Sequence, residues 1–270
     1  MIKLEEIDFS YDNEKIFENF SLKFKKGKFY ALLGKNGCGK STLIKLILGI
    51  ERIIKGNIYI NGLNLKNNIF ECRKEIGIVF QNPDEQIVTD IVEEEIAFAM
   101  ENYGFSSEFM EEKIEELVTE IEFQNKKTEK ISNLSGGEKQ RLCIASALVL
   151  NPKVLILDEA TSMLDSLNRK KIMDLLKKLN SKGITIILIT HHLTEIENCD
   201  YIYYLDKNQV KFSGDKNLFK SLIVKDELQL DLELPPMFKV AKNIYSKTKI
   251  DVSEDTCNLE KMGEYLWKSL

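Results

Sequence analysis

Residues 34–41 read Gly34-Lys35-Asn36-Gly37-Cys38-Gly39-Lys40-Ser41, and this loop decides the fold. The apolar run KFYALLG leads into it and LIKLILGI follows, which predicts a strand, a glycine loop and a helix in succession. In this context the loop fits the Walker A pattern G-x-x-x-x-G-K-[ST]. Glycines let successive backbone N–H groups converge on phosphate oxygens at the positive end of a helix. The sequence therefore predicts a nucleotide phosphate site.

Three polar side chains complete this loop. We expect Lys40 to reach the β- and γ-phosphates and the Ser41 hydroxyl to bind Mg²⁺, with Thr42 next to them. Cys38 stands where a small residue is common, and because backbone groups do the binding we expect little loss from it. The predicted ligands are ATP and Mg²⁺.

A second acidic motif follows another apolar run. VLILDEA places four apolar residues before Asp158 and Glu159, as expected where a buried parallel strand ends at the ligand edge of a sheet. We expect Asp158 to hold Mg²⁺ through water and Glu159 to orient and polarise the attacking water. Acidic residues also favour helix N-termini, so this motif gains its meaning from the Walker A loop.

The chain has two histidines, His191 and His192, directly after the apolar run ITIILIT. A surface histidine is usually inert. Here the expected strand order brings this strand end beside the phosphate loop, so that one ring could hydrogen-bond the γ-phosphate or the catalytic water.

Composition narrows the class of protein. The 270 residues carry 38 Lys and Arg against 43 Asp and Glu, and this acidic balance argues against a nucleic-acid partner. Five scattered cysteines, an odd count, indicate reduced cytosolic thiols. No apolar run approaches the ~20 residues that span a bilayer, and the start lacks the order of a signal peptide. If the protein serves transport, another chain must supply the pore.

The pattern along the chain predicts an order of layers. Short alternating runs in the first sixty residues predict a mostly antiparallel β layer, and residues 84–150 a helical stretch. Parallel-strand character returns at VLILD and ITIILIT, and residues 201–214 predict a hairpin. The composition changes beyond Gly214, so we expect one domain at 1–217, with the helical stretch inserted, and an extension at 218–270.

Residues 134–141 read LSGGEKQR, which resembles the signature motif of ABC ATPases. Together with the Walker A loop, this resemblance implies an α/β P-loop ABC ATPase: an N-terminal antiparallel β subdomain, a RecA-like parallel-sheet core, an inserted helical subdomain and a small C-terminal α+β or helical extension. In that family the signature residues, here Ser135, Gly136 and Gly137, cap the γ-phosphate bound by the opposite subunit. The implied assembly is a head-to-tail dimer around two MgATP.

Other family motifs occur in order, over roughly residues 1 to 215. Tyr11 resembles the aromatic residue that stacks on adenine, although it could be an ordinary strand tyrosine. Gln81 resembles the Q-loop glutamine that senses Mg²⁺ and the γ-phosphate. Asp165 closes a segment, residues 162–165, that resembles the D-loop of the dimer interface. His191 matches the switch histidine, with His192 where the family more often has Asp. The resemblance implies a site competent for hydrolysis.

The stretch 79–104, VFQNPDEQIVTDIVEEEIAFAMENYG, resembles the Q-loop and following helix of the energy-coupling factor ATPases, including cobalt-type importer subunits. The resemblance implies a second ATPase subunit, identical or paralogous, a transmembrane coupling subunit and a substrate-binding membrane subunit that selects a vitamin or transition-metal ion. It places the chain at the cytoplasmic face of the cell membrane as a peripheral protein. We expect an acidic docking face at Asp84 and residues 93–95, although acidic helix faces are commonly just solvated. The LPP at 234–236 resembles the start of a dimerisation segment.

Two other readings remain open from the sequence. One is the ATPase of an ordinary ABC importer or exporter with a different membrane partner. The other is a soluble ABC ATPase acting on DNA or ribosomes, against which stand the single Walker A loop, the lack of a long heptad insertion and the lack of a basic patch.

Overall fold

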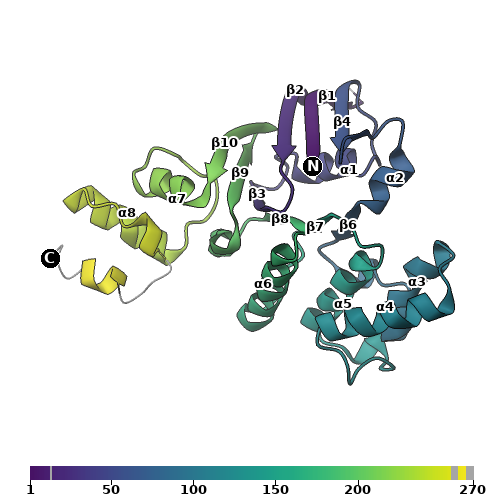
Figure 1. The fold of residues 1–270 in the computed structure, drawn as a ribbon. Coiled ribbons are helices and arrows are strands. Elements are labelled where there is room, and N and C mark those ends of the chain that lie inside the picture. Colours follow the sequence, from purple (N-terminus) through teal and green to yellow (C-terminus); the bar gives the residue numbers. More distant parts are fainter. Residues whose placement is uncertain (13, 257–260, 266–270) are drawn as a thin grey trace. The chain divides into compact units, whose positions relative to one another are not determined.

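The computed structural model describes residues 1–12, 14–256 and 261–265 (Figure 1). These residues form two compact units, one of residues 1–29 and 41–189, the other of residues 30–40 and those described from 190 onward. Cys257 and residues 266–270 of the final stretch YLWKSL lie outside the described residues. The predicted boundary at 217/218 stays a prediction.

The first unit contains an antiparallel sheet with the order β2-β1-β4-β5. Its strands are β1 (Ile2–Tyr11), β2 (Glu14–Phe24), β4 (Lys55–Ile60) and β5 (Leu63–Asn64). At the start of β1 apolar, buried residues such as Ile2 and Leu4 alternate with polar ones, because successive side chains of a strand point to opposite faces. The predicted antiparallel β layer is confirmed.

Three parallel strands of the first unit carry the predicted core. They are β6 (Ile76–Val79), β7 (Val154–Asp158) and β8 (Thr185–Thr190), with β7 paired to both others. Four successive residues of β7 are fully buried and only Asp158 at its end is partly exposed. Strands covered on both faces need such continuous apolar runs. Helix α6 (Ser166–Ser181) follows and buries Ile172, Leu176 and Leu179.

The helices of the first unit gather around α5 (Gly136–Leu148), which contacts α3 (Val92–Asn102) and α4 (Ser107–Glu120). Figure 1 shows these three helices side by side. They lie in the stretch 84–150 that the sequence predicts to be helical. Four shorter helical elements belong here: α1 (Lys40–Ile47), whose first residue lies in the other unit, α2 (Ile69–Lys74), η1 (Pro83–Glu85) and η2 (Ile131–Asn133).

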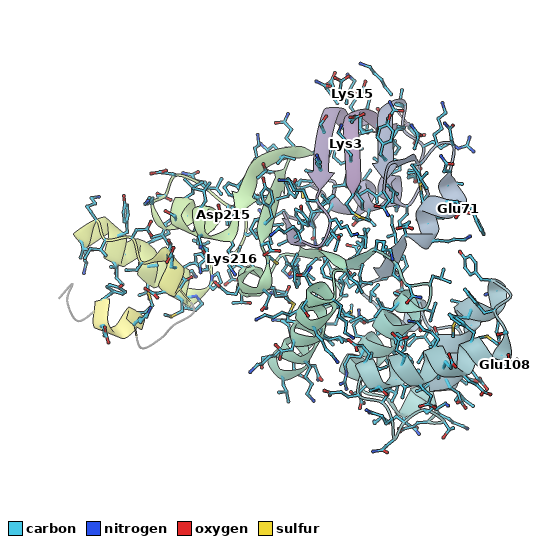
Figure 2. The ribbon with its side chains drawn as sticks, viewed as in Figure 1. Lys3, Lys15, Glu71, Glu108, Asp215 and Lys216 are labelled. Carbon is cyan, nitrogen blue, oxygen red and sulfur yellow. The ribbon has the colours of Figure 1, made fainter. Side chains whose placement is uncertain are left out.

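In the second unit, β3 (Phe29–Leu33), whose first residue lies in the other unit, runs parallel to β9 (Tyr201–Asp206), which forms the predicted hairpin with β10 (Gln209–Asp215). The helical elements here are η3 (Leu193–Asn198), α7 (Lys216–Val224), α8 (Pro236–Thr248) and η4 (Ser253–Asp255). Asp215 caps α7 by accepting hydrogen bonds from the backbone N–H groups of Asn217 and Leu218. Figure 2 labels Asp215 and Lys216 where β10 runs into this helix. Antiparallel sheet, parallel strands and helices agree with the predicted fold class.

Candidate functional site

The phosphate loop has the backbone shape that its glycines predict. Gly34, Gly37 and Gly39 all have positive φ, at 155°, 81° and 96°. A Cβ atom at Gly34 would collide with the Cys38 Sγ and the carbonyl oxygen of Leu205, so this position has no room for a side chain. At Gly37 nothing lies nearby, and the need for glycine is conformational.

The loop holds its own lysine. Lys40 is buried, and its Nζ donates to the carbonyl oxygens of Gly34 at 2.7 Å and Lys35 at 3.0 Å. These two bonds hold the ammonium group inside the loop. Burial raises the pKa of the neighbouring Cys38 thiol, which therefore stays protonated.

A cavity of ≈ 700 Å³ in the second unit brings predicted site residues together. Lys35 and Asn36 of the phosphate loop line it together with His191, and the opposite wall is formed by residues 231–236. The structure thus places His191 beside the loop. The ring centroids of His191 and His192 lie 4.2 Å apart, and the backbone N–H of His192 donates to the Thr190 hydroxyl oxygen at 2.9 Å.

The wall at 231–236 is attached to the loop by an ion pair that sequence reasoning missed. The Lys35 ammonium lies 2.5 Å from the Asp231 carboxylate. The Asp231 N–H also donates to the Tyr204 hydroxyl oxygen, at 2.9 Å. Nothing in the acidic composition of this stretch singles out Asp231 from its neighbours, so no sequence signal could have found it.

A second cavity, of ≈ 450 Å³, lies in the first unit and brings together Gln81 and Asp158. Met163 lines it too, and the Gln81 amide donates to the Ser162 hydroxyl at 3.1 Å. The predicted Q-loop residue, the carboxylate at the end of β7 and the predicted D-loop segment therefore share one polar site. The hydrogen bond from Gln81 to Ser162 thus joins the segment after β6 to the segment after β7.

Glu159 occupies an unusual backbone conformation, with φ at 52°. A non-glycine residue pays for this conformation, and such strain gathers at functional sites. The Glu159 N–H donates to the Ile189 carbonyl oxygen at 3.1 Å, and its own carbonyl oxygen accepts from Ser162 N–H at 3.0 Å. Both contacts hold the residue in place although its conformation is strained.

The signature residues form the N-terminus of α5. Ser135 and Gly136 are exposed, whereas a Cβ atom at the buried Gly137 would collide with the Asn168 side chain of α6. Glu138 completes a capping box: its Oε2 accepts the Ser135 N–H at 2.9 Å and the Ser135 hydroxyl at 2.8 Å. Its Oε1 lies 2.8 Å from the Lys126 ammonium. Lys126 and the Ser135 backbone N–H lower the pKa of Glu138 to about 2.

Two other predicted residues have local structural partners. Asp165 caps α6 by accepting the Asn168 N–H at 2.9 Å, and this bond lowers the pKa of its carboxyl group. Tyr11 makes an edge contact with Phe9, at 4.8 Å between ring centroids, and the Lys45 ammonium lies 6.0 Å from its ring centroid. Neither contact tests the predicted roles, which are the dimer interface for Asp165 and stacking on adenine for Tyr11.

The predicted acidic docking face is wrong at Glu95. This residue is only 5% exposed, and its Oε2 accepts hydrogen bonds from the N–H groups of Val88 and Thr89, each at 2.9 Å. It therefore ties the preceding loop to α3 from inside. Asp84 pairs with Lys139 at 2.6 Å. Of the three successive glutamates Glu94 alone is exposed, whereas Glu93 is half-buried.

The residues proposed for a metal ion fit Mg²⁺ in chemistry. Ser41, Gln81 and Asp158 offer hydroxyl, amide and carboxylate oxygens, and Mg²⁺ prefers oxygen ligands and keeps several waters. Within the described residues no group of three or more His, Cys, Asp or Glu side chains could hold a metal ion. A site with one carboxylate is consistent with that finding, because substrate phosphates supply the remaining ligands.

Comparison with known proteins decides the family. A family model described as ABC transporter matches residues 17–162, more than half of the chain. The energy-coupling factor transporter ATP-binding protein EcfA1 of Fusobacterium nucleatum is 38% identical and covers 100% of both chains. The chain belongs to the ABC transporter ATP-binding family. It is an ABC ATPase of the energy-coupling factor type.

Other relatives agree. EcfA1 of Oceanobacillus iheyensis is 36% identical and covers 99% of this ABC ATPase and 96% of its own chain. The solved structure of CbiO1 from Clostridium perfringens, described as part of the ABC transporter complex CbiONQ, has a TM-score of 0.79 at 27% identity and covers 98% of both chains. An ATP-binding cassette solved as a dimer with ADP and phosphate has a TM-score of 0.69 at 28% identity and covers 80% of this chain and 98% of its own. The predicted family and enzyme class are confirmed.

Exposed aromatic residues of this ABC ATPase gather around α2 and α3. Phe98 is 39% exposed on α3, next to Glu94 in the helical repeat. Phe70 and Tyr103 lie 5.8 Å apart between ring centroids, with the Lys74 ammonium over both rings. Exposed apolar groups of this kind mark interaction surfaces. Among the described residues, no helix is long and apolar enough to cross a membrane.

Proposed function

We propose that this ABC ATPase hydrolyses MgATP in a head-to-tail dimer and drives import through separate membrane subunits, at the cytoplasmic face of the membrane. The second ATPase subunit is identical or a paralogue. A transmembrane coupling subunit and a substrate-binding subunit complete the complex, and the cargo is a vitamin or a transition-metal ion. The names of the relatives support this reading over an ordinary importer or exporter, and over a soluble ATPase acting on DNA or ribosomes.

One observation carries the dimer. The N-terminus of α5 exposes Ser135 and Gly136, and apart from the adjoining residues and the helix's own backbone no described atom lies within 4 Å of the place where a Cβ of Gly136 would be. A helix N-terminus offers unpaired N–H groups and a partial positive charge, which favour a phosphate group. An exposed end of this kind can receive the γ-phosphate that another subunit presents.

In each composite site the residues have separate tasks. Lys40 leaves the carbonyl oxygens of the loop to bind the phosphates, while Glu159 accepts a proton from the attacking water and His191 holds the γ-phosphate. Tyr11 stacks on adenine. Mg²⁺, held by Ser41, Gln81 and Asp158, would neutralise charge on the phosphate oxygens. Asp165 lies in the segment that crosses the interface.

Mixing two inactive variants tests the dimer. Lys40→Ala weakens nucleotide binding, and Ser135→Arg blocks the signature end, so each variant alone is expected to lose most ATPase activity. If the site forms between subunits, a mixture restores one intact site in each heterodimer. With random pairing and independent sites, about a quarter of wild-type activity returns. A mixture of two Lys40→Ala preparations is the control, and a mixture no more active than this control contradicts the composite site.

A further inference from the structure

The N-terminus of α5 carries a negative charge at the place where an anion is to bind. Glu138 is the third residue of the helix, and its low pKa keeps the carboxylate ionised at every working pH. Its Oε2 accepts the proton of the Ser135 hydroxyl. A carboxylate in the first turn stabilises the helix, but it also opposes the positive potential that attracts phosphate.

Lys126 offsets this charge. Its ammonium lies 2.8 Å from Glu138 Oε1, on the side of the carboxylate away from the two bonds to Ser135. The Glu129 carboxylate also lies 3.7 Å from the same ammonium. The side chains of Lys126 and Glu138 are 34% and 21% exposed, so solvent screens their attraction only in part.

We propose that Lys126 is a positioning residue for ATP hydrolysis, holding Glu138 and neutralising its charge so that the Ser135 end of α5 can accept the γ-phosphate of the other subunit. The proposal rests on the proposed function, since it requires the signature to face nucleotide. Lys126 lies nine residues before Ser135, outside every motif in the sequence. It acts through Glu138, not by touching the nucleotide.

The neighbouring Lys127 provides a matched control. Its ammonium pairs with Glu115 at 2.5 Å and lies 3.7 Å from Glu93. Lys127→Ala therefore removes one positive charge from the same loop, as Lys126→Ala does. Neither partner belongs to the signature end of α5. A difference between Lys126→Ala and Lys127→Ala therefore reports the contact with Glu138 and not the net charge of the loop.

The test measures ATPase rate against ATP concentration, using the full chain with the subunits that co-purify with it. Lys126→Ala is expected to raise the half-saturating ATP concentration about two- to fivefold, a size typical of charges at helix ends, with a smaller change in kcat. Lys126→Arg and Lys127→Ala should stay close to wild type. The decisive comparison is the double variant: in a Glu138→Gln background, Lys126→Ala should have almost no further effect, because the charge at the signature end that Lys126 neutralises is gone.

Each result has a separate meaning. The proposal is overturned, while the ATPase function stands, if Lys126→Ala leaves the half-saturating ATP concentration at the wild-type value. It is also overturned if Lys126→Ala raises that concentration by the same factor in the Glu138→Gln background as in wild type. A wild-type complex that hydrolyses no ATP contradicts the proposed function, and this inference with it. Higher salt should narrow the gap between Lys126→Ala and wild type, whereas a purely structural defect would not respond in this way.

Discussion

The Lys35 ammonium and the Asp231 carboxylate lie 2.5 Å apart, so the segment before α8 is tied to the phosphate loop inside the second unit. Both side chains are more than half exposed, at 57% and 62%, and such pairs contribute only about 0.2–1 kcal/mol. Asp231→Asn should therefore raise amide exchange in residues 229–234 by up to about fivefold. Hydrogen exchange followed by mass spectrometry measures this.

Glu233→Gln is the control for that change, because Glu233 lines the same cavity two residues along. Raising the salt concentration should speed exchange in wild type toward the rate of Asp231→Asn, and leave that variant nearly unchanged. Equal protection in wild type and Asp231→Asn would mean that the ion pair does not hold the segment.

Glu159 gives the sharpest test of hydrolysis. Glu159→Gln keeps the size and the hydrogen-bonding backbone of the residue and removes the group that accepts a proton. Turnover is expected to fall about 10²-fold or more while nucleotide binding persists. Because ATP is no longer consumed, it should stabilise a dimer that gel filtration with MgATP detects. Near-wild-type turnover would show that another group activates the water.

Local pattern in the sequence predicted the backbone features that the structure shows around several candidate site residues, whose roles stay predictions. Gly34 and Gly37 were found because positive φ and close approach leave few alternatives to glycine, and the same requirement makes the Walker A spacing readable. The position of Asp158 at the end of β7 could be predicted because the continuous apolar run of a buried strand stops at a charged residue. These constraints act within a few residues, which is the range over which a single sequence is informative.

The contacts that the sequence did not reveal depend on tertiary structure. Glu95 looks like one of three equivalent surface glutamates until the loop at 88–89 folds over it and donates two N–H groups. Lys126 and Asp231 each belong to a charged stretch, and only the folded chain selects the partner of each. A pattern of charges predicts a polar face, but not which member of it is buried or paired.

Acid should weaken the signature end through Glu138. Its pKa in the folded protein, about 2, lies below the ordinary value of 4.5, so the ionised group stabilises the fold above about pH 4.5. This contribution, of the order of 1–3 kcal/mol, is lost as the pH falls from about 4.5 toward 2. Urea unfolding at pH 6 and at pH 3.5 measures it. The wild-type advantage over Glu138→Gln should shrink at the lower pH, and an advantage independent of pH would contradict the pKa.

The exposed surface of α3 is the part of the molecule that we expect to dock the membrane coupling subunit. Glu94 and Phe98 lie one helical turn apart on it, so an acidic group and an aromatic ring face the same side. Val88, 64% exposed in the loop after Gln81, adds an apolar group. This mixture of an acidic group and apolar surface suits a partner that presents basic and apolar side chains.

Glu94→Lys combined with Phe98→Ser should therefore separate assembly from hydrolysis. Both side chains are exposed, so the stability of the isolated subunit should change by no more than about 0.5 kcal/mol for each, and its ATPase activity should persist. Co-purification with the coupling subunit should fall at least tenfold, because the aromatic anchor and a charge are lost together. Glu108→Lys with Phe109→Ser, on the first turn of α4, is the matched control, since Phe109 is equally exposed at 38%. Loss of assembly in the control as well would mean that a general change of surface charge is responsible, and full assembly of the α3 variant would remove this helix from the route by which ATP hydrolysis reaches the membrane.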